Sequence, residues 1–428
     1  MDINYLLEVL RQGVSPFHCV SGAKEQLIKH GCKELFYKET WDLQRGEAYV
    51  IDHYGTSLFA FTIGKTYCAN DMFRVAAAHT DYPCLRIKPN PDFAVKGYAQ
   101  VNLEVYGGPI LNTWLDRPLG VAGRVMLKSE DPFHPKSVLY RSKKPVLTIP
   151  NLAIHMNREV NKGIELNAQT DLMPIIDMLP AEQKQTGYFM EFLAQELQVE
   201  KDQIMEFELN TYIFEEPVCI GAKETLLSSP RLDNQTSVSA LLEAFQEGKR
   251  TTGINLIALF DHEEIGNQSK QGAQALFLRD LMHRILRSLA LDEEQIEQSL
   301  YESMMLSVDV AHGLHPNKQN KMDITNQPVL GNGFCIKEAC SQSYATDALA
   351  ITILRQICEQ AKIPYQCFVN RSDVRGGGTL GSVMNTRIPA KTVDIGIPLL
   401  AMHSARELMG IADYDSLRQV VQAFFEIS

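Results

Sequence analysis

The sequence lacks the features that mark membrane, exported and nucleic-acid-binding proteins. No run approaches the ~18 uninterrupted apolar residues that a bilayer-spanning helix needs. The first residues, Met-Asp-Ile-Asn, are not a basic region followed by an apolar core. Positive charge is in deficit, with 41 basic against 52 acidic residues and a net charge of −11, so phosphate backbones and anionic lipid surfaces would on average repel the chain. We therefore expect a cytoplasmic protein that binds neither nucleic acid nor membranes.

Paired cysteines are also missing. The nine cysteines occur singly, without a CxxC pair, which argues for a reducing compartment and against a disulfide framework. We predict that they are small buried hydrophobic residues. With 428 residues, 45% of them hydrophobic, the chain can bury a large core in two or three domains, or in one long α/β enzyme with an insertion.

The pattern of strands and turns changes twice along the chain. Residues 1–86 show helices followed by strands, and residues 227–428 repeat a strand, a polar loop and a long helix. This pattern predicts an α/β fold with a mixed, mostly parallel sheet flanked by helices. Residues 87–226 instead contain short strand-like segments with frequent glycine and proline. We therefore predict a β-rich domain at 87–226, inserted into an α/β domain built from 1–86 and 227–428.

Four apolar runs of strand length end in acidic residues or histidine. They are 72–78 before His79, 254–260 before Asp261-His262-Glu263-Glu264, 304–308 before Asp309, and 393–400 shortly before His403. In open parallel sheets the carboxyl ends of the strands lie along one edge, where the ligand crevice forms, so we predict that these side chains converge. Asp233 is a fifth candidate, in a polar turn ahead of a helix expected to begin near Val238.

This set of histidines and carboxylates, without cysteine, is typical of a catalytic site for two divalent cations. Three protein ligands per ion leave room for water, whereas a closed structural zinc site would usually contain cysteine. Two cations ~3.5–4 Å apart repel each other strongly, so one aspartate is expected to bridge them. In Glu263-Glu264, one carboxylate can bind metal while its neighbour accepts a proton from water. Asp81 is well spaced to accept the remaining N–H of His79.

Each of these residues also has an ordinary interpretation. His79 alone would be a buried histidine at the end of a strand, Glu263-Glu264 a solvated loop, and Asp233 a helix cap. Asp309 and His403 alone would be unremarkable. Because these residues stand together after strand-like runs, the metal-site hypothesis is as well supported as the ordinary interpretations.

Nine short blocks, spread over nearly the whole chain, carry a family resemblance. They are AAHTD (77–81), NTWLDRPLGVAGRV (112–125), IPNLAIH (149–155), PRLDN (230–234), DHEEIG (261–266), SVDVAHGLHPN (307–317), YATD (344–347), NRSDVRGGGTLG (370–381) and AMHSARE (401–407). In this order they resemble the aspartyl aminopeptidase and aminopeptidase I family of dizinc exopeptidases. The resemblance implies a zinc exopeptidase-like fold and hydrolysis of the amino-terminal residue from peptides, with acidic (Asp/Glu) or else neutral residues preferred.

The resemblance also implies a role for each site residue. The implied metal ligands are His79, Asp233 and Asp309 for one zinc ion, and Asp233, Glu264 and His403 for the other. Glu263 would be the general base, and Asp81 the carboxylate behind His79. Cobalt or manganese is expected to replace zinc in such sites.

Oligomerisation and a substrate pocket follow from the same resemblance. The inserted domain would serve dimerisation, and the dimers would assemble into a dodecamer in which His155 reaches the neighbouring subunit's active site and stabilises the developing oxyanion. His312, His315 and Lys337 match the substrate pocket, where a lysine would favour an acidic first residue by charge pairing. The chain departs from the family pattern at Gly378, where Ser or Thr is common, so no hydroxyl function is assigned there.

Two alternative functions remain open from the residues themselves. The same metal pair can hydrolyse N-acyl amino acids or other small amides, and blocking the amino group of a peptide distinguishes that activity from an aminopeptidase. A noncatalytic metal-binding assembly protein is the second alternative, but the intact Glu263 beside a full ligand set argues against it.

Overall fold

The computed structural model describes residues 3–66, 73–180, 187–248 and 250–427, which form two compact units. The first unit comprises the chain up to Asp81, Pro217–Met402 and the chain from Glu407 onwards. The second comprises Tyr82–Glu216 and His403–Arg406. Within these described ranges, no helix has both the length and the apolarity needed to cross a bilayer.

Most of the described cysteines are buried, as predicted. Cys340 is exposed, and two further cysteines are partly buried. The buried ones are Cys19, Cys32, Cys84, Cys335 and Cys358. Cys68, and Met72 of the predicted strand 72–78, lie outside the described residues.

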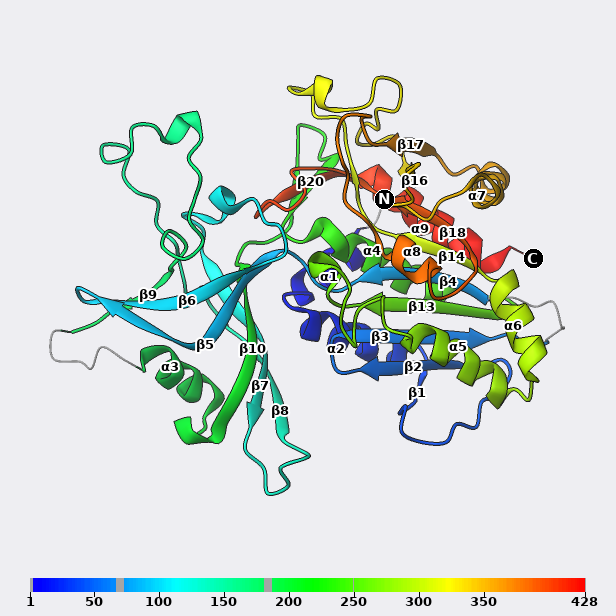
Figure 1. Ribbon diagram of the computed structural model, residues 1–428, viewed down its shortest axis with the longest axis horizontal. Coiled ribbons are helices and arrows are strands. Elements are labelled where there is room, and N and C mark those ends of the chain that lie inside the picture. Colours follow the sequence, from blue (N-terminus) through cyan, green and yellow to red (C-terminus); the bar gives the residue numbers. More distant parts are fainter. Residues whose placement is uncertain (1–2, 67–72, 181–186, 249, 428) are drawn as a thin grey trace. The chain divides into compact units, whose positions relative to one another are not determined.

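A nine-stranded sheet of the described residues forms the centre of the first unit (Figure 1). Five of its eight strand pairings are parallel, which confirms the prediction of a mixed, mostly parallel sheet. In spatial order the strands are β1 (Lys33–Glu34), β2 (Ala48–His53), β3 (Ser57–Ile63), β13 (Ile254–Phe260), β4 (Phe73–His79), β14 (Met304–Val308), β18 (Lys391–Gly396), β16 (Phe334–Glu338) and β17 (Tyr365–Val369).

A smaller sheet and eight helices complete the described part of this unit. The sheet has the order β11 (Val218–Ile220), β12 (Leu226–Ser229), β20 (Glu407–Gly410), β19 (Pro398–Leu400) and β15 (Ala311–His312). The helices are α1 (Asn4–Gln12), α2 (Pro16–Lys29), α4 (Leu232–Glu247), α5 (Phe277–Ser288), α6 (Glu293–Glu302), α7 (Ala348–Ala361), α8 (Leu380–Asn385) and α9 (Ile411–Glu426).

The helices cover both faces of the nine-stranded sheet. Successive side chains of a strand point to opposite faces, and β4 shows the result. Ala76 and Ala78 join the core formed with α1, α2, α4, α7 and α9, whereas Val75 and Ala77 join the core formed with α5, α6 and α8. Because β4 is covered on both faces, its sequence is nearly all apolar until it ends at His79.

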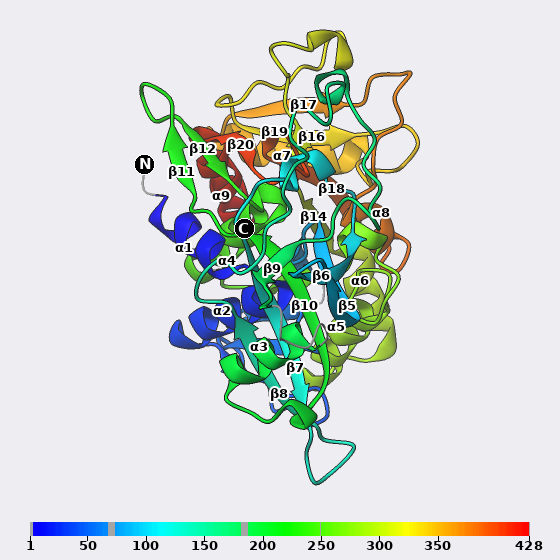
Figure 2. The same cartoon turned by 90° about the vertical axis from the view of Figure 1, so that its left-hand side faces the viewer.

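The second unit is built on a six-stranded antiparallel sheet of the described residues. In spatial order its strands are β8 (Lys136–Arg141), β7 (Leu119–Leu127), β10 (Ile204–Ile213), β5 (Cys84–Val95), β6 (Tyr98–Tyr106) and β9 (Ile175–Met178). Helix α3 (Tyr188–Leu197) lies against this sheet (Figure 2). The ring of Phe189 on α3 is 6.2 Å from that of Phe207 on β10.

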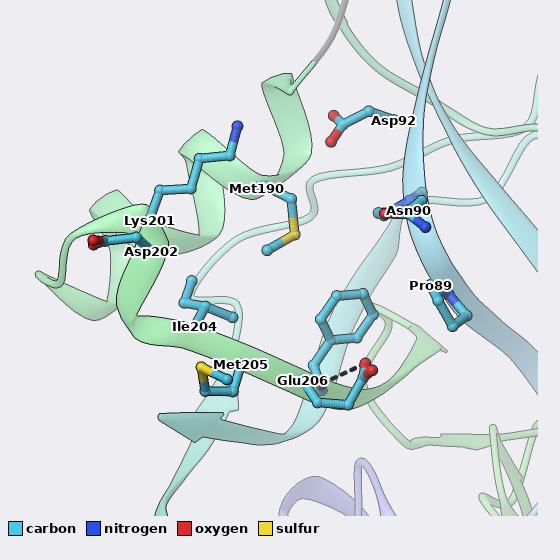
Figure 3. Close-up of a pocket in the computed structure, with 11 residues that line it drawn as sticks. Pro89, Asn90, Asp92, Met190, Lys201, Asp202, Ile204, Met205 and Glu206 are labelled. Atoms are coloured by element: carbon cyan, nitrogen blue, oxygen red, sulfur yellow. Dashed lines mark hydrogen bonds between the residues drawn. The ribbon is translucent and has the colours of Figure 1, made fainter. Parts of the chain in front are cut away.

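A groove of about 710 Å³ lies between β5, α3 and the start of β10 in this unit (Figure 3). Its lining includes Met190 and Met205 together with charged side chains such as Lys201 and Asp202. None of the described residues that line it is a histidine or a cysteine. The groove is therefore not a candidate for a catalytic zinc site.

Two local predictions about the first unit differ from the structure. The run 393–400 is not one strand, because β18 ends at Gly396 and β19 belongs to the smaller sheet. At the break, a Cβ on Gly396 would lie 1.3 Å from the carbonyl oxygen of Asp309, so only glycine fits this close crossing of two chain segments. The helix expected to begin near Val238 is part of α4, which begins at Leu232; because its backbone is not helical at Asp233 and Asn234, its regular part starts only three residues before the predicted start.

Candidate metal centre

Three neighbouring parallel strands bring ligand-type side chains to one edge of the nine-stranded sheet. β13 and β14 pair with the two sides of β4, with Phe260 opposite His79 on one side. Their carboxyl ends therefore meet at the same edge. His79 ends β4, Asp309 follows β14, and Glu263 lies in the turn after β13.

The imidazole of His79 faces two carboxylates that come from different elements. Its Nε2 lies 3.3 Å from Oδ1 of Asp233 and 3.5 Å from Oδ1 of Asp309. All three residues are buried, with 1%, 4% and 8% of their surface exposed. Their donor atoms lie within 4.8 Å of one another, which is a spacing that one cation can span.

The chemistry of this group fits a divalent cation. Two buried carboxylates side by side are unfavourable unless a positive charge compensates them. Burial alone would lower the pKa of His79, but its hydrogen bonds to Asp233, Asp309 and Asp81 raise it well above 6.5. The carboxylates that favour a proton on this ring also favour a cation beside it, and nitrogen and oxygen donors without cysteine suit catalytic zinc.

Asp81 connects the end of β4 to the turn after β13. Its Oδ1 lies 3.2 Å from Nδ1 of His79, so Nε2 is the nitrogen that remains for a metal ion. The same carboxylate accepts the backbone N–H of Glu263 at Oδ1 and that of Glu264 at Oδ2, both at 3.2 Å. Asp81 therefore contacts the imidazole and also holds the Glu263-Glu264 turn, which the spacing of the sequence did not indicate. Its role as the carboxylate behind His79 stays a prediction.

Glu263 and Glu264 lie in a short 3₁₀ turn, Glu263–Ile265, next to His79. Donor atoms of His79, Glu263 and Glu264 fall within 4.8 Å of one another. Burial raises the pKa of Glu263 to about 8; the charge on His79 opposes this shift, and the carboxylates of Asp309, Asp81 and Asp233 add to it. A carboxyl group that titrates near neutrality can both accept and release a proton.

The start of α4 is held against the strand ends by three consecutive residues. The backbone N–H of Asp233 donates to Oε2 of Glu407 on β20, at 3.0 Å. The side-chain amides of Asn234 and Gln235 donate to the carbonyl oxygens of Val308 and Thr80, at 3.0 and 3.1 Å. Asp233 is thereby held beside His79 and Asp309.

Sequence reasoning assigned no role to Asn234, Gln235 or Glu407, which support the start of α4. Asn234 stands in the block PRLDN and Glu407 ends the block AMHSARE, so both lay within blocks that carry the family resemblance but had no assigned role. Gln235 follows directly after the first block. The only available signal was their position beside the proposed ligands.

Lys337 contacts the metal-ligand candidate Asp309. It is 2% exposed, its Nζ donates to the carbonyl oxygen of Val310 at 2.9 Å, and it lies 3.8 Å from Oδ2 of Asp309. Burial lowers the pKa of Lys337, but Asp309 and other nearby acidic groups raise it above its usual value. Lys337 therefore carries a positive charge at this site.

The two histidines predicted for the substrate pocket are exposed. His312 ends β15, and its ring lies 5.8 Å from that of Phe368. His315 lies in the loop that follows, where its Nδ1 accepts the backbone N–H of Asn317 at 3.2 Å. Neither is among the metal-ligand groups of the described residues.

His403 and His155 both belong to the second unit. Nδ1 of His403 lies 3.1 Å from the carbonyl oxygen of Gly108, and its own carbonyl accepts the backbone N–H of Ile110 at 2.8 Å. His155 is exposed in a loop without regular secondary structure. The roles predicted for these two histidines remain predictions.

Comparisons with known proteins point to one family. The family model described as aminopeptidase I zinc metalloprotease (M18) matches residues 9–425. A probable M18 family aminopeptidase 2 of Clostridium novyi is 42% identical over 425 residues, which cover 99% of this chain and 98% of the relative.

Solved structures show the same fold. A chain in the cryo-EM structure of the Ape4 and Nbr1 complex superposes with a TM-score of 0.94 at 32% identity, covering 98% of this chain and 84% of that chain. The S. cerevisiae mApe1 dodecamer gives a TM-score of 0.83 at 24% identity, covering 99% and 95%. Because the family model and the Clostridium relative both span nearly the whole length, the chain belongs to the aminopeptidase I zinc metalloprotease family, M18, whose members are metallopeptidases.

Proposed function

We propose that the protein is a two-zinc aminopeptidase that removes the amino-terminal residue from peptides, with acidic or else neutral first residues preferred. The single observation that carries this proposal is the buried group of His79, Asp233 and Asp309, with Nε2 of the histidine facing both carboxylates. Family membership supports the peptidase activity over the hydrolysis of other amides and over a noncatalytic assembly role.

The ligands divide between two zinc ions in this proposal. His79, Asp233 and Asp309 would hold one ion, and Asp233, Glu264 and His403 would hold the other, with Asp233 as the ligand that both ions share. The buried group supports the first set; the residue types and the family resemblance support the second. Cobalt or manganese is expected to substitute for zinc.

The protein's own residues supply the proton transfers. When bound, the cations polarise the carbonyl of the first peptide bond and lower the pKa of a water molecule. Glu263 accepts the proton of the attacking water at its carboxylate and delivers it to the departing amine nitrogen. Asp81 keeps this carboxylate in place through the backbone N–H of Glu263 and keeps Nδ1 of His79 occupied.

A chromogenic amino-acid library tests the proposed activity. We expect release of the amino-terminal residue, loss of turnover with a chelator, and recovery with zinc, cobalt or manganese, because water activation requires the cations. Hydrolysis of amino-blocked peptides at equal rates would instead favour an amide hydrolase. A metal-replete, assembled sample that is inactive on the full library contradicts the proposal.

We further propose that the second unit serves dimerisation, that the dimers form a dodecamer, and that His155 acts in the neighbouring subunit. Apolar side chains stand exposed on both sides of His155: Leu152 at 53%, Ile154 at 48% and Met156 at 69%. Exposed apolar clusters of this kind mark interaction surfaces. The scattered, mostly buried cysteines support a reducing, cytoplasmic setting.

Replacing His155 by Ala tests its role across a subunit interface. We expect kcat to fall by about 10²–10³-fold, as for the loss of one oxyanion donor, with zinc content and mass by light scattering unchanged. His134→Ala, an exposed histidine of the same unit, is the control. Unchanged kcat in an assembled His155→Ala sample contradicts the proposal.

A further inference from the structure

Asp394 is a buried carboxylate that the proposed mechanism does not use. It is fully buried on β18, where it pairs with Lys337 of β16 across the sheet. Burial raises the pKa of Asp394, while the charge of Lys337 and several hydrogen bonds oppose that increase. Because a buried carboxylate is costly without donors and compensating charge, its partners indicate what it does.

The partners of Asp394 come from two segments that are distant in sequence. Its Oδ2 accepts the backbone N–H of Ala345 at 2.6 Å, and its Oδ1 accepts the hydroxyl of Thr379 at 2.5 Å. Its own N–H donates to Oγ1 of Thr346 at 2.9 Å. Thr379 occupies the N-cap position of α8, yet its hydroxyl does not cap that helix. This hydroxyl bonds to Asp394 instead.

The first turn of α8 is also pressed against this carboxylate. A Cβ on Gly381 would lie 2.6 Å from Oδ2 and 2.7 Å from Oδ1 of Asp394. The N–H of Gly381 donates to Oγ of Ser307, at 2.9 Å, two residues before Asp309. Glycine is therefore needed at 381 for the segment to reach both the carboxylate and β14.

One of the two segments held by Asp394 borders a residue proposed for the substrate pocket. The ring of Tyr344, next to Ala345, lies 5.0 Å from Nζ of Lys337 and 6.3 Å from the ring of Phe368. The ring of His312 lies 5.8 Å from that of Phe368. A shift of the segment 344–346 would move the ring of Tyr344 relative to Nζ of Lys337.

We propose that Asp394 is a positioning residue of the substrate pocket, which holds Tyr344 beside Lys337 and ties the segment entering α8 to the same strand. The inference rests on the proposed function. It adds a residue that positions the pocket in which the first side chain of the peptide would bind. No metal-ligand group of the described residues includes Asp394. We therefore expect loss of the Asp394 carboxylate to alter substrate binding rather than zinc binding.

Thr379→Val tests the proposal with a mild change, because it removes one donor to Asp394 and keeps the shape of the side chain. We expect KM to rise at least tenfold, with kcat and zinc content within threefold of wild type. Thr379→Ser, which restores the hydroxyl, should return KM to within threefold. Thr386→Val removes an exposed hydroxyl just after α8 and is the control. Unchanged KM in Thr379→Val, or zinc loss in proportion to activity, overturns the proposal.

Amide hydrogen exchange provides a readout that does not depend on turnover. The N–H of Ala345 donates to Asp394 and that of Gly381 to Ser307, so both should exchange at least tenfold faster in Thr379→Val and faster still in Asp394→Asn. Amides of α7 and α9 serve as the internal reference. Equal exchange at Ala345 and Gly381 in wild type and Thr379→Val overturns the positioning role, even if the protein hydrolyses no peptide.

Discussion

Glu263→Gln is expected to lower kcat by about 10²–10⁴-fold, the usual contribution of a general base, and to leave both proposed zinc ions bound. The amide keeps the size of the side chain and its backbone contact to Asp81, but it cannot accept the proton of the attacking water. Steady-state kinetics and zinc content by elemental analysis, measured on the same sample, check this result.

Two further variants serve as the comparison and the control for Glu263→Gln. Glu264→Gln should lose zinc as well as activity, because Glu264 is proposed as a ligand, whereas the exposed Glu294→Gln on α6 should behave as wild type. If Glu263→Gln loses both metal ions, Glu263 is a ligand and the proton acceptor must be another group. If its kcat stays near wild type, the assignment of the base is wrong.

Asp233→Ala is expected to abolish activity and to release both zinc ions. The proposal makes Asp233 the ligand common to both ions, and its removal also leaves the two cations without the charge that offsets their repulsion. We expect kcat/KM to fall by at least about 10³-fold, because metal-ion catalysis contributes several kcal/mol and about 1.4 kcal/mol corresponds to a factor of ten.

Asp309→Asn provides the comparison for the bridging role. Asp309 is proposed to bind one ion only, so this variant should retain about one zinc per subunit. Asp280→Asn, at an exposed position of α5, controls for the loss of a negative charge. Thermal melting in the presence of chelator separates loss of metal from loss of fold. Retention of one zinc by Asp233→Ala contradicts the bridge.

The strand ends of the first unit show which part of the candidate site could be predicted from apolar runs in the sequence. β4, β13 and β14 are short runs of buried apolar residues, and parallel strands place their carboxyl ends on one edge. The convergence of His79, Glu263 and Asp309 follows from these two facts. The same reasoning failed for 393–400, since an apolar run does not reveal that the chain leaves one sheet at Gly396 and enters another at Pro398.

The sequence by itself determined the fold class, the family blocks and the residue types of the metal centre, because these depend on local patterns and on chemistry that a side chain carries with it. Only the tertiary structure decided which groups hold those residues in place. Glu407 reaches the backbone of Asp233 across 174 positions, and Asp394 joins segments 49 and 15 positions away. Such hydrogen bonds are set by the packing of whole elements, so no spacing along the chain reveals them.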